Sequence, residues 1–255
     1  MPELDISDSG AVRTLTLNRP EKRNALNSAL VEALKRALRD ADTDERVRAI
    51  IIRGAGKDFC SGADLESLRK ISESSYEENL DDARSLADLF AMIRRLKVPV
   101  IAAVHGRALA GGCGLATACD LVIAAESARF GYPEVKIGFV PAIVMALLRR
   151  NVSEKRAFEI ATQGFEFSAA EAERLGLINH VVSDDTFDEE VARYAAVYDG
   201  VSRSAVMLSK KLLYEMDSLD FADAVEAGAK ANAEARMSED CKIGIKRFLE
   251  RGAEK

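Results

Sequence analysis

Three stretches of this chain combine residue types that can hold an anion and move a proton. Residues 54–65 and 106–116 are rich in glycine and alanine, and residues 130–141 place Glu134 directly after Pro133. Small residues let a backbone approach a ligand closely, and the free N–H groups at the start of a helix suit an anion or a developing oxyanion. A carboxylate can take up a proton and return it. These stretches are therefore the candidates for chemistry in the sequence.

The first stretch does not match the common phosphate-binding loops. Phe59 and Cys60 break the spacing of a dinucleotide fingerprint, and Lys57 is followed by aspartate instead of the serine or threonine of a Walker loop. Taken alone, residues 54–65 are better explained as a surface turn whose glycines adopt positive φ angles.

The other two stretches predict helix starts. Residues 106–116 predict a helix that begins near Gly111 or Gly112, although their small residues also suit tight packing of a helix on a strand. Pro133 predicts the first position of a short helix, with Glu134 in its first turn. A carboxylate placed there also complements the helix dipole, which is worth about 0.3–1 kcal/mol.

The elements that must position these stretches alternate between strand and helix. Apolar runs predict strands at residues 12–17, 47–52, 98–104 and 120–124. Apolar residues three or four apart predict helices across residues 26–38 and 86–93. Each of the two glycine-rich stretches therefore follows a strand, where a backbone turn can face a ligand.

The second half of the chain is mostly helical. Pairs typical of capping boxes predict two helix starts, Ser168 with Glu171 and Thr186 with Glu189. From about residue 200 onward the chain carries almost no strand pattern. The sequence predicts an α/β core over residues 1–190, followed by a helical region over residues 191–255.

Composition excludes several classes of protein. The chain has 255 residues, 48% of them apolar, and a net charge of −6, which argues against a general nucleic-acid binder and against attachment to anionic lipid by charge. The longest charge-free stretches fall well short of the roughly 20 residues that span a bilayer, and the acidic N-terminal residues lack a secretory pattern. The four cysteines match no metal-binding spacing. We expect a cytoplasmic protein without a metal.

Taken together, the three stretches resemble the enoyl-CoA hydratase/isomerase family, also called the crotonase family. Residues 18–27, Asn-Arg-Pro-Glu-Lys-Arg-Asn-Ala-Leu-Asn, are similar to its N-terminal signature. Residues 61–65 and 108–120 are similar to its two oxyanion-hole segments, and residues 130–138 to its catalytic loop. With Phe-Leu-Glu-Arg at residues 248–251, the resemblance covers nearly the whole chain.

The resemblance implies a fold, a ligand and three catalytic groups. The fold would be a spiral of ββα turns with C-terminal helices that form a trimer or a dimer of trimers. The ligand would be an acyl-CoA thioester, with no cofactor besides the CoA of the substrate. The N–H groups of Ala63 and Gly111 would hold the thioester oxygen, and Glu134 would act as acid and base. Two such donors stabilise an enolate-like state.

The resemblance also implies how the CoA group is bound. Because the protein is acidic and CoA is anionic, local positive charge must offset the overall field, and Lys22, Arg23 and Arg107 lie in the matching segments. The remaining candidate substrate-binding residues are Ala25, Ser61, Asp64, Leu65, Ala108, Gly114 and Pro133.

The sequence departs from the family pattern near the reacting group. Hydratases of the family carry two glutamates, one matched by Glu134 and one twenty residues earlier, where this chain has Gly114. Dienoyl-CoA isomerases carry an acid at the position of Lys136, which sets that reaction aside. The usual Pro-Gly-Ala-Gly-Gly is replaced by Pro-Ala-Ile-Val-Met at residues 141–145, a segment that shapes the acyl end of the pocket.

Three functions remain open on this basis. We expect addition of water to a 2-enoyl-CoA, because most family members of this layout handle 2-enoyl-CoA. Because the first carboxylate is missing, a 3-enoyl to 2-enoyl isomerase that uses Glu134 alone is the alternative. A non-catalytic acyl-CoA-binding or RNA-binding member is less favoured, because Glu134 is intact and the chain is acidic.

Overall fold

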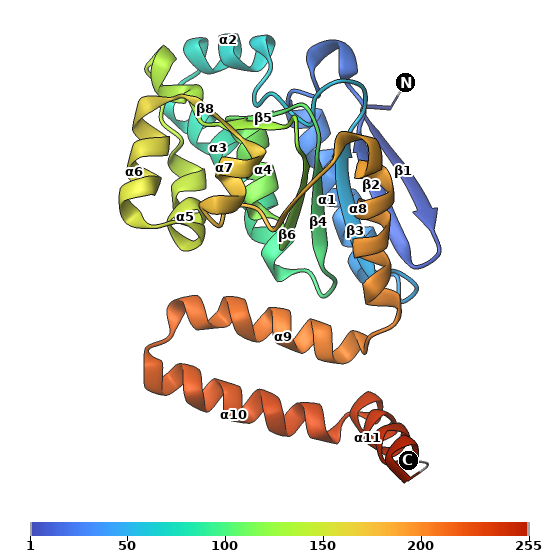
Figure 1. The fold of residues 1–255 in the computed structure, drawn as a ribbon. Coiled ribbons are helices and arrows are strands. Elements are labelled where there is room, and N and C mark those ends of the chain that lie inside the picture. Colours follow the sequence, from blue (N-terminus) through green and yellow to red (C-terminus); the bar gives the residue numbers. More distant parts are fainter. Residues whose placement is uncertain (1, 254–255) are drawn as a thin grey trace.

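Six strands form one twisted sheet that runs through the core of the molecule (Figure 1). In the computed structural model, which describes residues 2–253, their order is β1-β2-β3-β4-β6-β9. The strands are β1 (Leu4–Ser9), β2 (Val12–Leu17), β3 (Ala49–Gly54), β4 (Val100–Val104), β6 (Leu121–Ala125) and β9 (His180–Val182). Only the β1–β2 pair is antiparallel, so the remaining strands need crossover connections.

A second, smaller layer of extended chain lies beside this sheet. It contains β5 (Arg107–Leu109), β7 (Arg129–Gly131) and β8 (Glu166–Ser168), and Cys60 joins it through a bridge to Ala108. Successive turns of the chain thus contribute a strand to the large sheet, a short extended segment to the small layer, and then a helix. This repeat is the ββα spiral that the resemblance implies.

Helices lie around the large sheet and the small layer (Figure 1). They are α1 (Ser28–Thr43), α2 (Leu65–Glu73), α3 (Tyr76–Arg95), α4 (Gly111–Ala118), α5 (Ala142–Asn151), α6 (Glu154–Gln163), α7 (Ala169–Arg174) and α8 (Phe187–Ala196). Short 3-10 turns are η1 (Pro20–Lys22), η2 (Pro133–Ile137), η3 (Asp184–Thr186), η4 (Val197–Asp199) and η5 (Met216–Ser218). Leu30 and Leu34 of α1 pack on one face against Ile50, whereas Phe187 of α8 packs on the other against Ile51.

The C-terminal helices extend away from the sheet (Figure 1). They are α9 (Arg203–Glu215), α10 (Phe221–Met237) and α11 (Glu239–Ala253). Of these, α9 packs on α3, and α10 and α11 pack on α9. The domain boundary expected at residue 190 falls inside α8, a helix that packs on the large sheet, and the helical extension begins with α9.

The structure confirms the longer predicted elements and corrects one cap. The four predicted strands and the two predicted helices are present, and the Ser168 side chain accepts a hydrogen bond from the Glu171 N–H at the start of α7. Thr186 makes no side-chain hydrogen bond at the start of α8. The prediction for Thr186 is wrong because the chain enters α8 directly from η3 and not from the extended conformation of an N-cap.

Candidate active site

The structure brings the three predicted stretches side by side in the small layer. The Cys60 N–H donates to the Arg107 carbonyl over 3.0 Å, and the Leu109 N–H donates to the Cys60 carbonyl over 2.9 Å. On its other edge β5 pairs in parallel with β7, which leads directly into η2 and Glu134. Segments separated by tens of residues in the sequence are therefore neighbouring extended chains.

The Ala63 N–H faces away from Leu26, the residue with which Ala63 is paired. The Leu26 N–H donates to the Gly62 carbonyl over 2.6 Å, and the Asp64 N–H donates to the Leu26 carbonyl over 3.2 Å. This parallel bridge uses the groups on either side of Ala63, so the N–H of Ala63 points to the opposite side. Ala63 itself is exposed.

The Gly111 N–H lies close to this first donor. Gly111 opens α4, so its N–H has no acceptor within the helix. A Cβ placed on Gly111 would lie 4.0 Å from Gly62 Cα, and one placed on Gly62 would lie 2.8 Å from Ala110 Cβ. Gly62 has a φ of +93°, so glycine is required there both for conformation and for close approach. Within residues 2–253, neither the Ala63 nor the Gly111 N–H has an acceptor.

Glu134, the carboxylate expected to act as acid and base, lies at the end of the β7 segment. It occupies the second position of η2, behind Pro133, as predicted. The side chain is half-buried, and its Oε2 atom is buried without a hydrogen-bond partner among the described residues. This burial raises the pKa of the Glu134 carboxyl. A carboxyl with a raised pKa exchanges protons more readily near neutral pH.

At Gly114 the site is closed by apolar side chains. Gly114 is buried, and a Cβ placed on it would lie 2.3 Å from Val144 Cγ1 and 3.1 Å from Phe90 Cε2. Val144 belongs to α5, within the segment that departs from the family pattern. No side chain fits at position 114 unless Val144 moves. The glycine at position 114 and the altered segment 141–145 are therefore two parts of one structural feature.

Positive charge lies on the segments that flank the two donors. The Ser61 N–H donates to the Arg23 carbonyl over 3.1 Å, which places Lys22 and Arg23 beside the first donor segment. The side chains of Arg23 and Arg107 are 63% and 42% exposed, so both are accessible to an anionic group. Lys22 Nζ lies 3.8 Å from Asp64 Oδ2.

Three other predicted binding residues lie inside the protein. Ala25 is buried and its carbonyl accepts a hydrogen bond from Arg19, while Ala108 is buried beneath the Cys60 bridge. The Asp64 carboxylate is also buried and accepts from the Ser67 N–H and from Arg19. The backbone of Leu65 begins α2, but its side chain lies outside the described residues.

Sequence reasoning missed several residues that shape this site. Asn24 is buried at a φ of +54°, and its amide nitrogen donates to the carbonyls of Ala55 and Asp58 over 2.8 and 2.7 Å. It thereby holds the N-terminal segment against the loop that leads to Ala63. The sequence analysis also missed Arg19, Phe90 and Val144, because their partners lie far away in the sequence.

A family model described as enoyl-CoA hydratase/isomerase matches residues 7–255. The chain belongs to this family. A relative from Thermus thermophilus, whose name places it among the enoyl-CoA hydratases, is 40% identical over 96% of both chains. A relative from Escherichia coli named 2,3-dehydroadipyl-CoA hydratase is 34% identical over 98% of this chain and 97% of its own.

Solved structures of the family share the whole fold. A Mycobacterium smegmatis enoyl-CoA hydratase matches with a TM-score of 0.94 and 36% identity, over 98% of this chain and 97% of its own. Human enoyl Coenzyme A hydratase domain-containing protein 3 matches with a TM-score of 0.93 and 30% identity, over 98% of both chains. The resemblance stated from the motifs is thereby confirmed, together with the crotonase-like fold.

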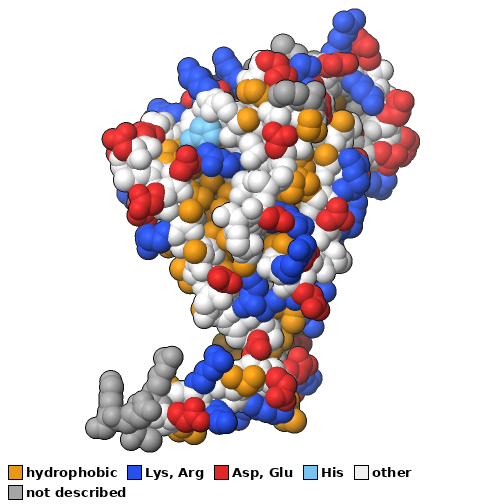
Figure 2. Space-filling model, turned by 90° about the vertical axis from the view of Figure 1, so that its right-hand side faces the viewer, with side chains coloured by type: hydrophobic (Ala, Val, Ile, Leu, Met, Phe, Trp, Pro, Cys, Tyr) orange, Lys and Arg blue, Asp and Glu red, His pale blue; other side chains and the backbone are white. Residues whose placement is uncertain are grey.

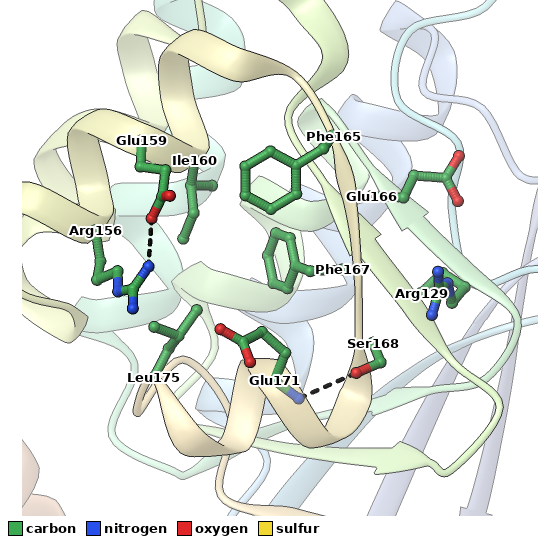
Figure 3. A pocket seen from close by; sticks show the side chains of 10 residues that line it. All are labelled: Arg129, Arg156, Glu159, Ile160, Phe165, Glu166, Phe167, Ser168, Glu171 and Leu175. Carbon is green, nitrogen blue, oxygen red and sulfur yellow. Dashed lines mark hydrogen bonds and ion pairs between the residues drawn. The ribbon is translucent and has the colours of Figure 1, made fainter.

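A cavity of about 380 Å³ lies away from this family's expected site (Figure 3). Phe165 and Phe167 form part of its lining, and charged side chains such as Arg129, Arg156 and Glu159 stand around them. None of the predicted site residues lines it.

The described part of this family member offers neither a metal-binding cluster nor a membrane-spanning helix. Residues 2–253 contain no group of three or more histidine, cysteine, aspartate or glutamate side chains arranged to hold a metal ion. Within the same residues, no helix has both the length and the apolar character needed to cross a membrane.

Proposed function

We propose that this chain transforms an acyl-CoA thioester through an enolate-like state. The N–H groups of Ala63 and Gly111 donate to the thioester oxygen, and Glu134 moves the proton. The proposal rests above all on the convergence of these two free donors, since a Cβ on Gly111 would lie 4.0 Å from Gly62 Cα. Loss of one such donor costs about 3–4 kcal/mol of transition-state stabilisation in comparable sites.

The proposed reaction is addition of water to a 2-enoyl-CoA. Water adds to the β carbon and gives a proton to Glu134, negative charge collects on the thioester oxygen, and Glu134 then gives that proton to the α carbon. The names of the Thermus thermophilus and Escherichia coli relatives support hydration. Apart from the CoA of the substrate, this chemistry uses protein groups and water and needs no cofactor.

A 3-enoyl to 2-enoyl isomerase is the second candidate, and the closed position 114 favours it. Val144 and Phe90 fill the space beside Gly114, so position 114 contributes no carboxylate beside Glu134. In an isomerisation, Glu134 removes a proton from the α carbon and returns it to the γ carbon. One carboxylate is sufficient for that transfer, and no water has to be held.

The CoA group would lie along the positive segments that flank the donors. Lys22, Arg23 and Arg107 are proposed to offset the charge of its phosphates, and the exposed guanidinium groups of Arg23 and Arg107 are accessible for this role. Figure 2 shows basic and acidic side chains interspersed over one face of the molecule, without the continuous basic stripe of a nucleic-acid-binding surface.

The deciding experiment is mass spectrometry of products from crotonyl-CoA and from a 3-enoyl-CoA, each beside Glu134→Gln. A product heavier by one water from crotonyl-CoA establishes the hydratase. An isomer of unchanged mass from the 3-enoyl-CoA, with no water added to crotonyl-CoA, establishes the isomerase. Absence of both, with intact acyl-CoA binding, would contradict catalysis and leave a binding protein.

A further inference from the structure

A buried ion pair holds the two chain segments that position the Ala63 N–H. The guanidinium of Arg19 donates from Nη2 to Asp64 Oδ2 over 2.8 Å, and its Nη1 donates to the Ala25 carbonyl. Arg19 and Asp64 are only 4% and 6% exposed. One side chain therefore ties the residue before Leu26 to the residue after Ala63.

This arrangement straddles the single bridge from which the Ala63 N–H projects. The bridge consists of two backbone hydrogen bonds to Leu26, of 2.6 and 3.2 Å. Two hydrogen bonds alone would let these two segments twist relative to each other. The planar guanidinium of Arg19 bonds to both segments. Because its geometry is rigid, it fixes the distance and the angle between its two acceptors.

The surroundings of the pair agree with a role in positioning. Glu3 Oε1 lies 3.2 Å from Arg19 Nε, so each of the three guanidinium nitrogens has an oxygen nearby. Burial alone would raise the pKa of the Asp64 carboxyl, but the hydrogen bonds from Ser67 and Arg19 outweigh it and lower this pKa to about 2. A buried ion pair adds little stability compared with apolar side chains of the same volume, because both charges lose water.

We propose that Arg19 and Asp64 are positioning residues that aim the Ala63 N–H at the thioester oxygen. The inference rests on the proposed function, in which that N–H is an oxyanion donor. Donors act over about 2.7–3.1 Å from the oxyanion, and a misplacement of about 1 Å can lower the rate about 100-fold. Both side chains are buried, so in this role both act through the backbone of Ala63.

The alternative is that Asp64 serves only as the N-cap of α2. Asp64 Oδ1 accepts from the Ser67 N–H over 2.7 Å, so this role is present in any case. Asparagine caps helices about as well as aspartate. The Asp64→Asn variant therefore keeps the cap and removes the ion pair, and Arg19→Lys keeps the charge and removes the fork.

The test measures how strongly the protein polarises a thioester carbonyl that it does not convert. The probe is butyryl-CoA with a ¹³C-labelled carbonyl, and the readout is the infrared C=O stretch at saturating protein. In the wild type we expect the stretch below its value in water. In Asp64→Asn and Arg19→Lys we expect it to return toward the aqueous value, with kcat about 10- to 100-fold lower and a smaller change in KM.

The control is a partly buried ion pair outside the segments that resemble the oxyanion-hole segments. Asp44 pairs with Arg13 over 3.1 Å, with side chains 17% and 12% exposed. Asp44→Asn should lower thermal stability without shifting the C=O stretch. If Asp64→Asn and Arg19→Lys give folded proteins with the wild-type stretch, the positioning role is overturned. If the wild type itself leaves the stretch at its aqueous value, the oxyanion proposal fails first, and this inference fails with it.

Discussion

Glu134 combines two properties that an acid/base group needs. One of its oxygens is buried without a partner among the described residues, and burial raises the pKa of its carboxyl. We expect Glu134→Gln to lower kcat about 100- to 10,000-fold, since that is the usual contribution of a positioned general acid or base. Calorimetry should show butyryl-CoA binding within about twofold of wild type, and full activity in the variant would remove Glu134 from the mechanism.

The pH dependence of activity follows from the burial of the same group. Burial raises the pKa of the Glu134 carboxyl above its ordinary value of 4.5, and the reaction starts from the ionised form. The rate constant kcat/KM should therefore fall as pH is lowered through this raised pKa. A profile of kcat/KM measured between about pH 4 and about pH 9 checks this expectation. An apparent pKa at or below 4.5 on the acid side would contradict the assignment.

The burial of Glu134 also affects stability, and the protein loses stability as the carboxyl ionises. A carboxyl with a raised pKa in the folded protein binds its proton more tightly there than in the unfolded chain. Its ionisation therefore destabilises the fold, and this cost appears as pH rises above the unfolded pKa and is complete above the folded one. Glu134→Gln removes the cost, so its gain in Tm over wild type should be larger at neutral than at acidic pH. An equal gain in Tm at both pH values would show that burial does not raise the pKa of Glu134.

At the scale of residues, the sequence predicted correctly those positions where neighbouring residues determine the local structure. Pro133 fixes φ at the start of η2, and Glu134 follows it by one residue, so both were predicted correctly. Asn24 and Arg19 were not predicted, because their roles depend on carbonyls and a carboxylate some 30 to 45 residues away. Nothing in the local pattern shows that an arginine in a turn will be buried.

The four inner strands of the large sheet were predictable, whereas its two edge strands and the strands of the small layer were not. Residues of β3 and β4 are almost all buried, so apolar runs identify them. The strands β5, β7 and β8 have three residues each, and β1 is an exposed edge of polar residues. Their extended form comes from pairing with neighbours, which a local pattern does not contain. The small layer nevertheless brings the segments that carry Ala63, Gly111 and Glu134 side by side.

The contact between α4 and α5 makes a prediction about the reaction. Because Val144 Cγ1 lies where a Cβ on Gly114 would be, Gly114→Glu alone should destabilise the protein by about 1–3 kcal/mol through overpacking. Val144→Gly in the same chain removes the obstructing methyl groups. We expect Gly114→Glu/Val144→Gly to recover much of the lost Tm and to raise the ratio of hydration to isomerisation, as product analysis would show.

Matched controls separate space from charge at this contact. Val144→Gly alone leaves a cavity and should cost about 2–3 kcal/mol without changing the product ratio. Gly114→Gln/Val144→Gly has the bulk of the double variant without its charge. If Gly114→Glu is as stable as wild type, or if the glutamine and glutamate double variants give the same products, the closed position does not govern the reaction.

Docking of α9 depends on one buried ammonium group. Lys210 Nζ donates to the carbonyls of Ile93 and Val98, each over 2.9 Å, and to Asp120 Oδ2 over 2.6 Å. Removing the ammonium leaves the Asp120 carboxylate buried without its charge partner. We expect Lys210→Met to lower the free energy of unfolding by about 3–5 kcal/mol in urea denaturation.

Lys211 provides the comparison for this variant. It is the next residue on α9, with a side chain 63% exposed and only a 3.7 Å contact to Glu215. Lys211→Met should change the free energy of unfolding by no more than about 0.5 kcal/mol. Equal effects of the two variants would show that α9 is held by its apolar contacts and not by the Lys210–Asp120 pair.

At the scale of the whole molecule, the C-terminal helices expose more apolar surface than a monomer needs. Large apolar side chains on α10 and α11 stand in solvent, with Phe221 86% and Phe248 78% exposed. These helices contact the rest of the chain through α9 (Figure 1). Burying each such side chain against another copy would contribute about 1.5–3 kcal/mol.

We therefore expect a homo-oligomer, a trimer or a dimer of trimers, as the family resemblance implies. Sedimentation velocity at micromolar protein should give the mass of three or six chains. Phe221→Glu/Phe248→Glu places two charges on the exposed apolar faces and should shift the protein toward monomer, whereas Glu234→Lys, on an exposed polar position of α10, should not. A wild type that sediments as a monomer contradicts the assembly, and a double variant that stays assembled moves the interface away from α10 and α11.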